Sequence, residues 1–400
     1  MPFFLPTPGG VGRAGLPAAG GGTAPFSPLR PRRALKSLML RGFLVCSVIL
    51  HRAEKYCSRV LASSSTLRRR RFVGFALPIM LGKPGALYHG SPRRADGANL
   101  LVMRGINVDE MLWTNPEGAE LAFQQTGSGA PVLLCNGLGG SWRAWTHQLR
   151  HFEGQYRFLS WDYRGLYGSS LPADPEKIRI EDHARDALAI LDRAGVERAS
   201  IWGWSMGVQV ALELFRHAPE RITNLVLLNG VSGRPWDTVL DLSIFREAIP
   251  GVLKGLGTVP GIVGAITKRV MHWPETIPWA KRVGLAAPTL DEEVFHALAT
   301  SFDDIDMKTY VQLLERLGEH DASDVLNTID VPTLLISGAK DRFTPRSVME
   351  RMSQVIPGAE MMVIPGGTHY VAAEYPERVN LRIEKFFGET RFGQPHRVGE

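Results

Sequence analysis

The sequence is poor in cysteine, in long apolar runs and, over its first quarter, in acidic residues. Only three cysteines occur in 400 residues, namely Cys46, Cys57 and Cys135, so the fold does not rest on a disulfide framework. Cys135 lies in an apolar run and is expected to be a small buried side chain. No group of His, Cys, Asp and Glu has the spacing of metal ligands, and we predict neither a metal site nor another cofactor.

Long apolar runs are also missing. Residues 42–50 and 72–81 form the most apolar stretches of the first hundred residues, and the second contains Pro78. A helix needs ~20 apolar residues to cross a bilayer. Neither stretch is therefore predicted to span a membrane.

Acidic residues are scarce in residues 1–105, which hold 17 Lys and Arg against two acids, Glu54 and Asp96. The remaining chain holds 29 basic and 38 acidic residues, so the net charge of +6 conceals a mildly acidic body. An acidic body argues against an enzyme that binds nucleic acid. We therefore expect a small-molecule substrate and no nucleic-acid partner.

Residues 1–105 are predicted to be a basic, low-complexity N-terminal extension without a fixed fold, because Gly, Pro, Ala and Arg dominate them. The body would stand alone if translation began at Met80 or Met103. Two alternatives stay open, an organellar transit peptide and a basic arm that makes weak contact with anionic membranes. Otherwise we expect a cytoplasmic protein, and no oligomeric state follows from the sequence.

From residue 107 onward, short apolar runs alternate with amphipathic segments. A hairpin is expected over residues 110–114 and 120–126, and buried strands over 131–136, 157–162, 200–204, 222–229, 333–337 and 359–364. Helices are expected between them, for example over 142–152 and 180–194. Alternating strands and helices predict an α/β fold with a mostly parallel sheet covered by helices on both faces.

The stretch Gly203-Trp-Ser-Met-Gly207 lies between a predicted strand and an apolar-periodic helix. Glycines on both sides permit a strained serine and close packing of the helix on the strand. The turn also puts the amide of Met206 at a helix N-terminus, where developing negative charge is favoured. This arrangement resembles the G-x-S-x-G nucleophile elbow of the α/β-hydrolase family, and the resemblance extends over about residues 107–387.

The resemblance implies a catalytic triad in the chain order Ser, acid, His, with an eight-stranded sheet. His369 follows the last predicted strand within Pro365-Gly-Gly-Thr-His-Tyr370, and Asp341 follows the strand over 333–337. Ser205 would then be the nucleophile, His369 the base and Asp341 the acid that orients it. Asp321 and Asp330 are weaker candidates because neither follows a strand.

The loop Gly137-Leu-Gly-Gly140 lacks the G-x-G-x-x-G pattern and the lysine of nucleotide-binding loops. The resemblance implies instead that the amide of Leu138, with that of Met206, forms the oxyanion hole. The family commonly has His where this chain has Asn136, which leaves the support of the loop open. Asp162 and Arg164, in a further family-like stretch, are expected to tie loops together.

Residues 231–330 are predicted to be a helical cap inserted into the sheet domain, with helices over 239–248, 251–271, 290–302 and 307–317. The core would then consist of residues 106–230 and 331–390, and 391–400 would be a tail. We expect the substrate pocket to be lined by Gly137, Trp204, Trp236 and Trp273.

The predicted activity is hydrolysis of carboxylic esters of small to medium apolar substrates through an acyl-enzyme. The same triad also supports C–C bond hydrolysis, lactone opening, acyl transfer and cofactor-free haloperoxidation, and these stay alternatives. A non-catalytic ligand receptor on the same fold is a further alternative. Serine at position 205 disfavours epoxide hydrolases and haloalkane dehalogenases, which have Asp at the elbow.

Overall fold

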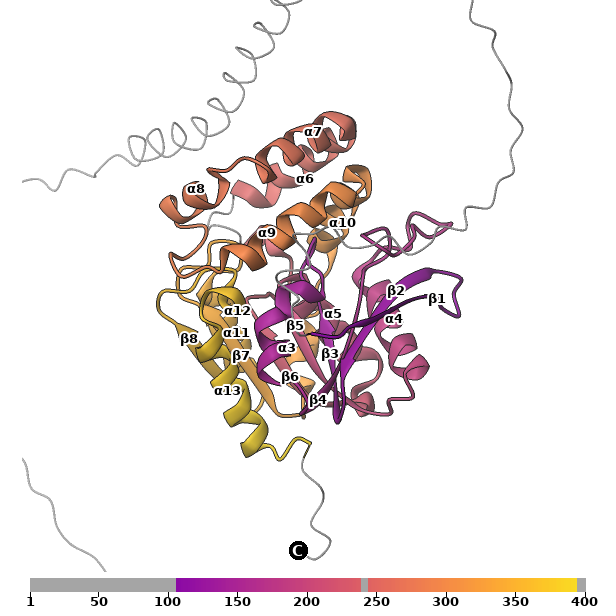
Figure 1. Ribbon diagram of the computed structural model, residues 1–400, viewed down its shortest axis with the longest axis vertical. Helices are drawn as coiled ribbons and strands as arrows, with labels where there is room; N and C mark the ends of the chain where they lie inside the picture. Colours follow the sequence, from indigo (N-terminus) through magenta and orange to yellow (C-terminus); the bar gives the residue numbers. More distant parts are fainter. Residues whose placement is uncertain (1–105, 239–243, 394–400) are drawn as a thin grey trace, which may run out of the picture. The chain divides into compact units, whose positions relative to one another are not determined.

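A computed structural model describes residues 106–238 and 244–393 of the chain (Figure 1). The predictions for residues 1–105 and for the last part of the tail, 394–400, lie outside the described residues. So does the first part of the helix predicted over 239–248.

Eight strands form one sheet in the order β1-β2-β4-β3-β5-β6-β7-β8. The sheet is mixed: β1 pairs antiparallel with β2, and β2 antiparallel with β4, while the other pairs are parallel. The predicted hairpin and the mostly parallel eight-stranded sheet are therefore confirmed. The strands are β1 (Asp109–Thr114), β2 (Glu120–Gly127), β3 (Ala130–Cys135), β4 (Tyr156–Trp161), β5 (Ala199–Trp204), β6 (Ile222–Leu228), β7 (Thr333–Gly338) and β8 (Glu360–Ile364).

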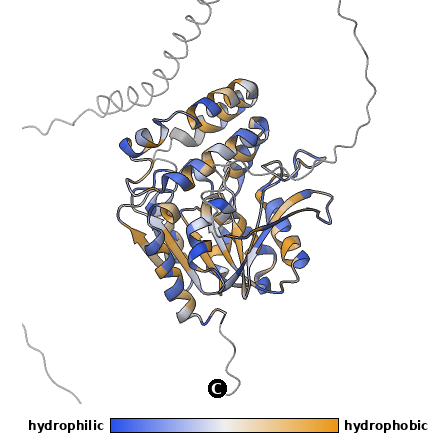
Figure 2. Cartoon of the chain, in the orientation of Figure 1, coloured by the Kyte–Doolittle hydropathy of each residue, from blue (hydrophilic) through white to orange (hydrophobic). Residues whose placement is uncertain are grey.

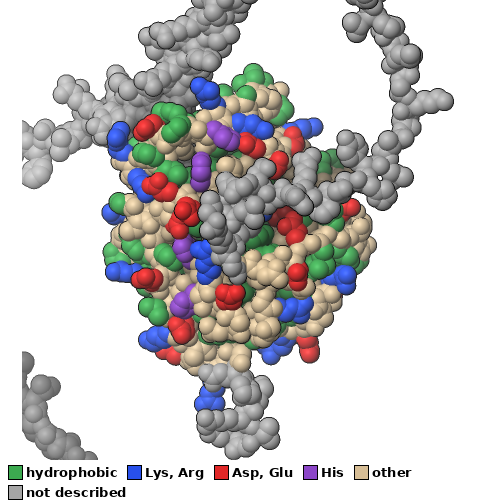
Figure 3. Space-filling model, viewed as in Figure 1, with side chains coloured by type: hydrophobic (Ala, Val, Ile, Leu, Met, Phe, Trp, Pro, Cys, Tyr) green, Lys and Arg blue, Asp and Glu red, His purple; other side chains and the backbone are tan. Residues whose placement is uncertain are grey.

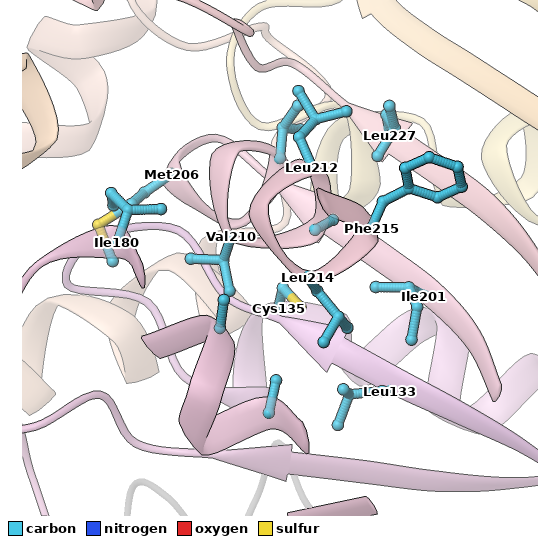
Figure 4. Packing of buried hydrophobic residues seen from close by; sticks show 14 of the residues in the cluster. Leu133, Cys135, Ile180, Ile201, Met206, Val210, Leu212, Leu214, Phe215 and Leu227 are labelled. Atoms are coloured by element: carbon cyan, nitrogen blue, oxygen red, sulfur yellow. The ribbon is translucent and has the colours of Figure 1, made fainter. Parts of the chain in front are cut away.

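Helices cover both faces of the sheet because the parallel strands are apolar on both sides. In β3, Leu133 and Cys135 join one buried cluster, whereas Val132 and Leu134 join a second cluster on the other face. The first cluster includes α4 (Ile180–Arg193), α5 (Met206–His217) and α11 (Arg346–Val355); the second includes α3 (Thr146–His151) and α13 (Pro376–Glu389). Figure 4 shows the side of the first cluster on which α5 lies over β3 and β5, and Figure 2 shows the apolar strands between these helix layers.

Within the described part of the segment between β6 and β7, five α-helices lie beyond the end of the sheet at which β5 ends (Figure 1). They are α6 (Ile244–Gly257), α7 (Pro260–Met271), α8 (Thr276–Arg282), α9 (Glu292–Ser301) and α10 (Met307–Glu319). We refer to these helices and the loops that connect them as the cap. Both α6 and α7 pack on α10, and α9 packs on the segment Trp142–Trp145 at the start of α3.

The single helix predicted over residues 251–271 is wrong, because the chain breaks between Gly257 and Pro260 and bends by 103° there. Proline has no amide hydrogen to continue a helix, but it fits the first helical position of α7. Among the described residues no single helix is long and apolar enough to cross a membrane. The two segments Ile249–Gly257 and Pro260–Met271 have the required length and hydropathy only when they are counted as one. The helix α8 was not predicted.

The tail predicted from residue 391 begins with a packed aromatic side chain. The ring of Phe392 stacks on Tyr156, with centroids 5.5 Å apart, and also contacts Phe387. The apolar surface of α13 and of the start of β4 therefore continues past the last helix into the described end of the chain.

Arg164 ties loops together, as its sequence context predicts. Its side chain is fully buried and forms a two-bond ion pair with Asp186 of α4, at 2.8 and 2.7 Å, and a third bond with Glu117 at 3.0 Å. A buried arginine is tolerated only where its charge and donors are matched in this way. The β1–β2 turn, the loop after β4 and α4 therefore meet at one guanidinium group.

Replacing Arg164 with Met would leave Asp186 buried and unpaired. We expect Arg164→Met to lower the free energy of unfolding by about 3–5 kcal/mol. The matched control is Arg346→Met, whose half-exposed side chain pairs only with Glu350 one helical turn away and should cost less than about 1 kcal/mol. Urea denaturation followed by circular dichroism measures both, and equal costs would contradict the structural role.

Candidate active site

Ser205 occupies a strained turn between β5 and α5. Its backbone has φ 55° and ψ −118°, and it is one of the described non-glycine residues with positive φ. Such a conformation is costly for a residue with a Cβ atom and persists only where the surroundings enforce it. The amide of Ser205 is held by the carbonyl of Leu228 on the neighbouring strand β6, at 3.0 Å.

The two glycines of the motif are required by close approach of backbone segments. A Cβ atom at Gly207 would lie 1.9 Å from the carbonyl oxygen of Cys135, and one at Gly203 would lie 2.5 Å from the carbonyl oxygen of Gly207. The first turn of α5 therefore packs directly against the end of β3 and against β5. This packing holds the serine at the carboxyl edge of the sheet.

The structure brings the three residues of the predicted triad together from three separate loops. His369 lies between β8 and the short helix α12 (Val371–Glu374), and Asp341 follows β7. His369 Nε2 is 2.9 Å from Ser205 Oγ, and His369 Nδ1 is 2.8 Å from Asp341 Oδ2. These distances place the three side chains in one continuous hydrogen-bonded chain.

The Asp341 carboxylate is buried and fully occupied by donors. Its Oδ1 accepts the amides of Phe343 and Thr344 at 2.8 and 3.0 Å, and its Oδ2 accepts the Thr344 hydroxyl at 2.6 Å as well as His369. Burial raises the pKa of Asp341, but the charge of His369 and the hydrogen bonds from His369 and Thr344 outweigh it and hold the pKa below its usual value. The carboxylate is therefore ionised at neutral pH.

Two buried polar residues that the sequence analysis missed hold this arrangement. Asn229, at φ 44° after β6, donates from Nδ2 to Asp341 Oδ2 at 2.5 Å and to the carbonyl of Thr368 at 3.0 Å. Glu374 accepts the amide of Thr368 at 2.7 Å, the hydroxyl of Thr368 and the amide of Ala287 at 2.8 Å. Asn229 directly follows β6, and its position at the carboxyl end of a parallel strand could have identified it as a site residue. Glu374 lies in a helix of four residues, and no sequence pattern marks it.

The glycine loop after β3 is well supported although Asn136 replaces the histidine common in the family. The side-chain amide of Asn136 donates to Ser160 Oγ and to the carbonyl of Trp161, both at 3.1 Å, and its oxygen accepts Trp145 Nε1 at 3.0 Å. Tyr163 donates to the Asn136 carbonyl at 2.7 Å. These four hydrogen bonds fix the position of Asn136, where the loop that carries Leu138 begins.

The loop and the start of α5 lie against each other beside Ser205. A Cβ atom at Gly137 would lie 3.3 Å from Ser205 Cβ and 2.9 Å from the Trp204 ring. Met206 is the first residue of α5, so its amide has no acceptor within the helix. The amide of Leu138 forms no hydrogen bond with another described residue.

Aromatic side chains surround the three residues, but the predicted pocket tryptophans divide into two groups. Trp204 contacts His369 and donates from Nε1 to the carbonyl of His369 at 2.9 Å. Trp236 packs instead against Gly318 of α10, and Trp273 is about half exposed at the end of α7. No hydrogen bond or ring contact within the described residues joins these two tryptophans to Ser205, Asp341 or His369.

Cap residues do reach the glycine loop. Phe302 and Tyr310, whose rings meet edge to face, both lie within contact distance of a Cβ atom built at Gly139. Phe343 stands edge-on to His369, with centroids 5.2 Å apart. A narrow apolar recess beside Trp204 is lined by Ala144, Trp145, Leu298, Tyr370, Ala372 and Ala373. The side chains that line this recess and approach the glycine loop and His369 are thus mainly aromatic and aliphatic.

Comparison with known proteins identifies the family. The family model described as alpha/beta hydrolase fold matches residues 130–376, a range that contains every element from β3 to the start of α13. The chain belongs to the α/β-hydrolase family. A putative carbamate hydrolase (RutD) of Azorhizobium caulinodans is 26% identical over 271 residues, which cover 68% of this chain and 96% of the relative. The 3-oxoadipate enol-lactonase 2 of Acinetobacter baylyi is 26% identical over 257 residues, covering 63% and 86%.

Solved α/β-hydrolase structures share the fold. A thermophilic esterase from Thermogutta terrifontis superposes with a TM-score of 0.56 at 23% identity and covers 70% of this chain and 99% of its own. An enol-lactonase from Burkholderia xenovorans gives 0.57 at 22% identity, with 70% and 100% covered. At such identities the likeness shows a common fold and leaves the substrate to other arguments.

The contact between Gly207 and the Cys135 carbonyl makes a testable prediction. Gly207→Ala should lower the free energy of unfolding by about 1–3 kcal/mol, because the added methyl group meets backbone that cannot rotate away. The control is Gly251→Ala on α6, where a Cβ atom meets nothing within 4 Å; it should raise stability by about 0.5–1 kcal/mol. Thermal unfolding of both variants measures the difference, and a neutral Gly207→Ala would contradict the described turn.

Proposed function

We propose that this member of the α/β-hydrolase family is a serine hydrolase that cleaves carboxylic esters of small to medium apolar substrates. The observation that carries the proposal is the hydrogen-bonded chain from Ser205 through His369 to Asp341, with the serine strained at the end of β5. Serine is a weak nucleophile by itself and needs an adjacent base to take its proton. His369 is the only described imidazole within hydrogen-bond reach of its hydroxyl.

The protonation states follow from the hydrogen bonds of Asp341. An ionised carboxylate only accepts, so the nitrogen of His369 that faces Asp341 must carry a proton. In the neutral imidazole that a general base requires, the other nitrogen, Nε2, has a free lone pair directed at Ser205 Oγ. His369 takes the serine proton as Oγ attacks the substrate carbonyl, and Asp341 stabilises the resulting imidazolium. The histidine later returns the proton to the leaving alcohol and activates water for deacylation.

The amides of Leu138 and Met206 would stabilise the tetrahedral oxyanion. Both are at the carboxyl edge of the sheet beside Ser205, and Met206 is at the N-terminus of α5, where the helix dipole favours negative charge. The close packing of Gly137 on Ser205 fixes the position of the glycine loop relative to the turn that carries Ser205. In comparable enzymes one such donor contributes about 3 kcal/mol to transition-state stabilisation.

The apolar walls support an ester with an apolar acyl group. Trp204, Phe302 and Phe343 approach the serine, the glycine loop and the histidine, and none of them offers a charge to a polar substrate. Lactone opening is the second candidate, because enol-lactonases occur among the relatives and a lactone is a cyclic ester. Carbamate hydrolysis, suggested by the RutD relatives, uses attack on a similar carbonyl.

The ester proposal is tested with p-nitrophenyl acetate, butyrate, octanoate and palmitate. Turnover should peak at short or medium chains and should fall by about 10⁶-fold in Ser205→Ala, as when other triads lose their nucleophile. Enol-lactone and carbamate substrates are assayed in parallel. Equal turnover by wild type and Ser205→Ala would contradict the proposed nucleophile, and faster lactone than ester turnover would favour the second candidate.

The role of Asp341 is tested by a matched pair of substitutions. Asp341→Asn keeps the shape of the side chain but turns an acceptor into a donor facing His369, so kcat should fall by about 10⁴-fold. Asp321→Asn is the control, because Asp321 is an exposed turn residue whose carboxylate caps the amide of Ser323; kcat should stay within about twofold. Similar losses in both variants would mean that Asp341 is not the acid of the triad.

A further inference from the structure

The outer surface of the cap carries an unusual stripe of apolar side chains. On α7 and its flanks Val259, Ile262, Ile266, Val270 and Trp273 follow one another at intervals of three or four residues and are all exposed. This spacing puts them on a single face of the helix. An amphipathic helix of an isolated globular domain normally turns such a face toward the core.

The apolar face of α7 is turned away from the core. The inner face packs on the rest of the cap, where Val263 joins the main apolar cluster and a Cβ atom at Gly264 would lie 3.3 Å from Met307 of α10. The outer stripe is therefore additional to the face that stabilises the helix. Its exposure is a feature of the cap surface and not the result of a helix that lacks packing.

The stripe continues onto α6. Val252 and Leu256 are exposed and one turn apart, whereas Leu253 is buried and a Cβ atom at Gly257 would face Val311 of α10. We call these residues together the cap patch; it comprises Val252, Leu256, Val259, Ile262, Ile266, Val270 and Trp273. In Figure 1, α6, α7 and α8 are the cap helices farthest from the sheet, and Figure 3 shows hydrophobic side chains next to Lys and Arg at that end of the molecule.

The charged side chains on the sequence segment that carries the cap patch are basic, and acidic residues lie at its edge. Lys254, Lys268 and Arg269 are exposed on the same two helices, and no Asp or Glu occurs between residues 248 and 274. Acidic residues begin at the edge, with Glu275 before α8 and with Asp303, which pairs with His272 at 3.1 Å. The patch is thus apolar and cationic at once.

We propose that the cap patch is a docking surface for an anionic lipid bilayer. A helix that presents an apolar face bordered by Lys and Arg lies in the plane of a membrane interface, with its apolar side chains among the acyl chains and its cations near the headgroups. Exposed tryptophan favours this interface, and Trp273 lies at the end of the stripe. The 103° bend between α6 and α7 is suited to two short helices that lie along a surface.

Two other occupants fit the charges less well. In a symmetric contact with a second copy, the same surface meets itself, so Lys254 and Lys268 would approach the same lysines of the other copy. The chain's own residues 1–105 carry 17 Lys and Arg against two acids and would meet the same repulsion. An anionic bilayer accepts both the apolar side chains and the cations.

The test uses the full-length protein with vesicles of phosphatidylcholine and phosphatidylglycerol at equal proportions, and with phosphatidylcholine alone. Ile262→Glu with Ile266→Glu puts two carboxylates into the patch, and partitioning measured by flotation should fall roughly tenfold or more on both vesicle types. The neutral vesicles matter because the basic residues 1–105 lose their electrostatic attraction there. The wild type should bind the anionic vesicles at least roughly tenfold more tightly than the neutral ones.

The matched control replaces two equally exposed apolar residues outside the cap. Leu112 on β1 and Leu381 on α13 are 62% and 60% exposed, and so at least as exposed as Ile262 and Ile266 at 61% and 47%. Leu112→Glu with Leu381→Glu adds the same charge to the protein but should change partitioning less than twofold. All substituted residues are at the surface, so thermal unfolding should remain that of the wild type.

Hydrogen–deuterium exchange locates the contact directly. Peptides from residues 249–273 should exchange more slowly in the presence of anionic vesicles, while those of α13 should not change. Protection confined to residues 1–105, or equal binding by the wild type and the Ile262→Glu, Ile266→Glu variant, would overturn the proposal. It would also be overturned if the wild type were a dimer by light scattering, the Ile262→Glu, Ile266→Glu variant a monomer, and neither bound vesicles. The proposal does not depend on the ester activity, and none of these measurements uses it.

Discussion

The contact between the first turn of α5 and the end of β3 determines the geometry on which the rest of the site depends. Because Gly207 lies against the Cys135 carbonyl, the helix begins without a linker after β5, and Ser205 is forced to positive φ. The same contact brings the start of α5 next to the glycine loop that follows β3. One approach of two backbones therefore strains the turn at Ser205 and brings the N-terminus of α5 close to the glycine loop.

Buried polar side chains near this turn satisfy one another's hydrogen-bonding groups. Asp341 receives donors from a hydroxyl, an imidazole, an amide side chain and two backbone amides, so its negative charge is compensated by hydrogen bonds. Asn229 links that carboxylate to the carbonyl of Thr368, next to the histidine. In the proposed mechanism, preorganisation of this kind means that little reorganisation accompanies the proton transfer.

Sequence reasoning succeeded where a local pattern fixes a local structure. Alternating strands and helices predicted the sheet. Ser205, Asp341 and His369 were proposed as a triad because each follows a strand at the carboxyl edge, and the structure places their side chains within hydrogen-bond distance. It failed where partners lie far away in the chain. Glu374 looks like a surface residue of a short helix, and its role depends on a segment 87 positions earlier. The break before Pro260 was missed because the apolar pattern continues through it.

The bonds of Glu374 have a mechanical consequence for the cap. The Glu374 carboxylate accepts hydrogen bonds from the amide of Ala287 and from the amide and hydroxyl of Thr368. The Thr368 hydroxyl also lies 3.1 Å from the carbonyl oxygen of Leu285. The segment that leads from α8 to α9 is thereby clamped to the histidine loop. Displacement of this segment of the cap would therefore have to break hydrogen bonds that also hold Thr368, the residue before His369.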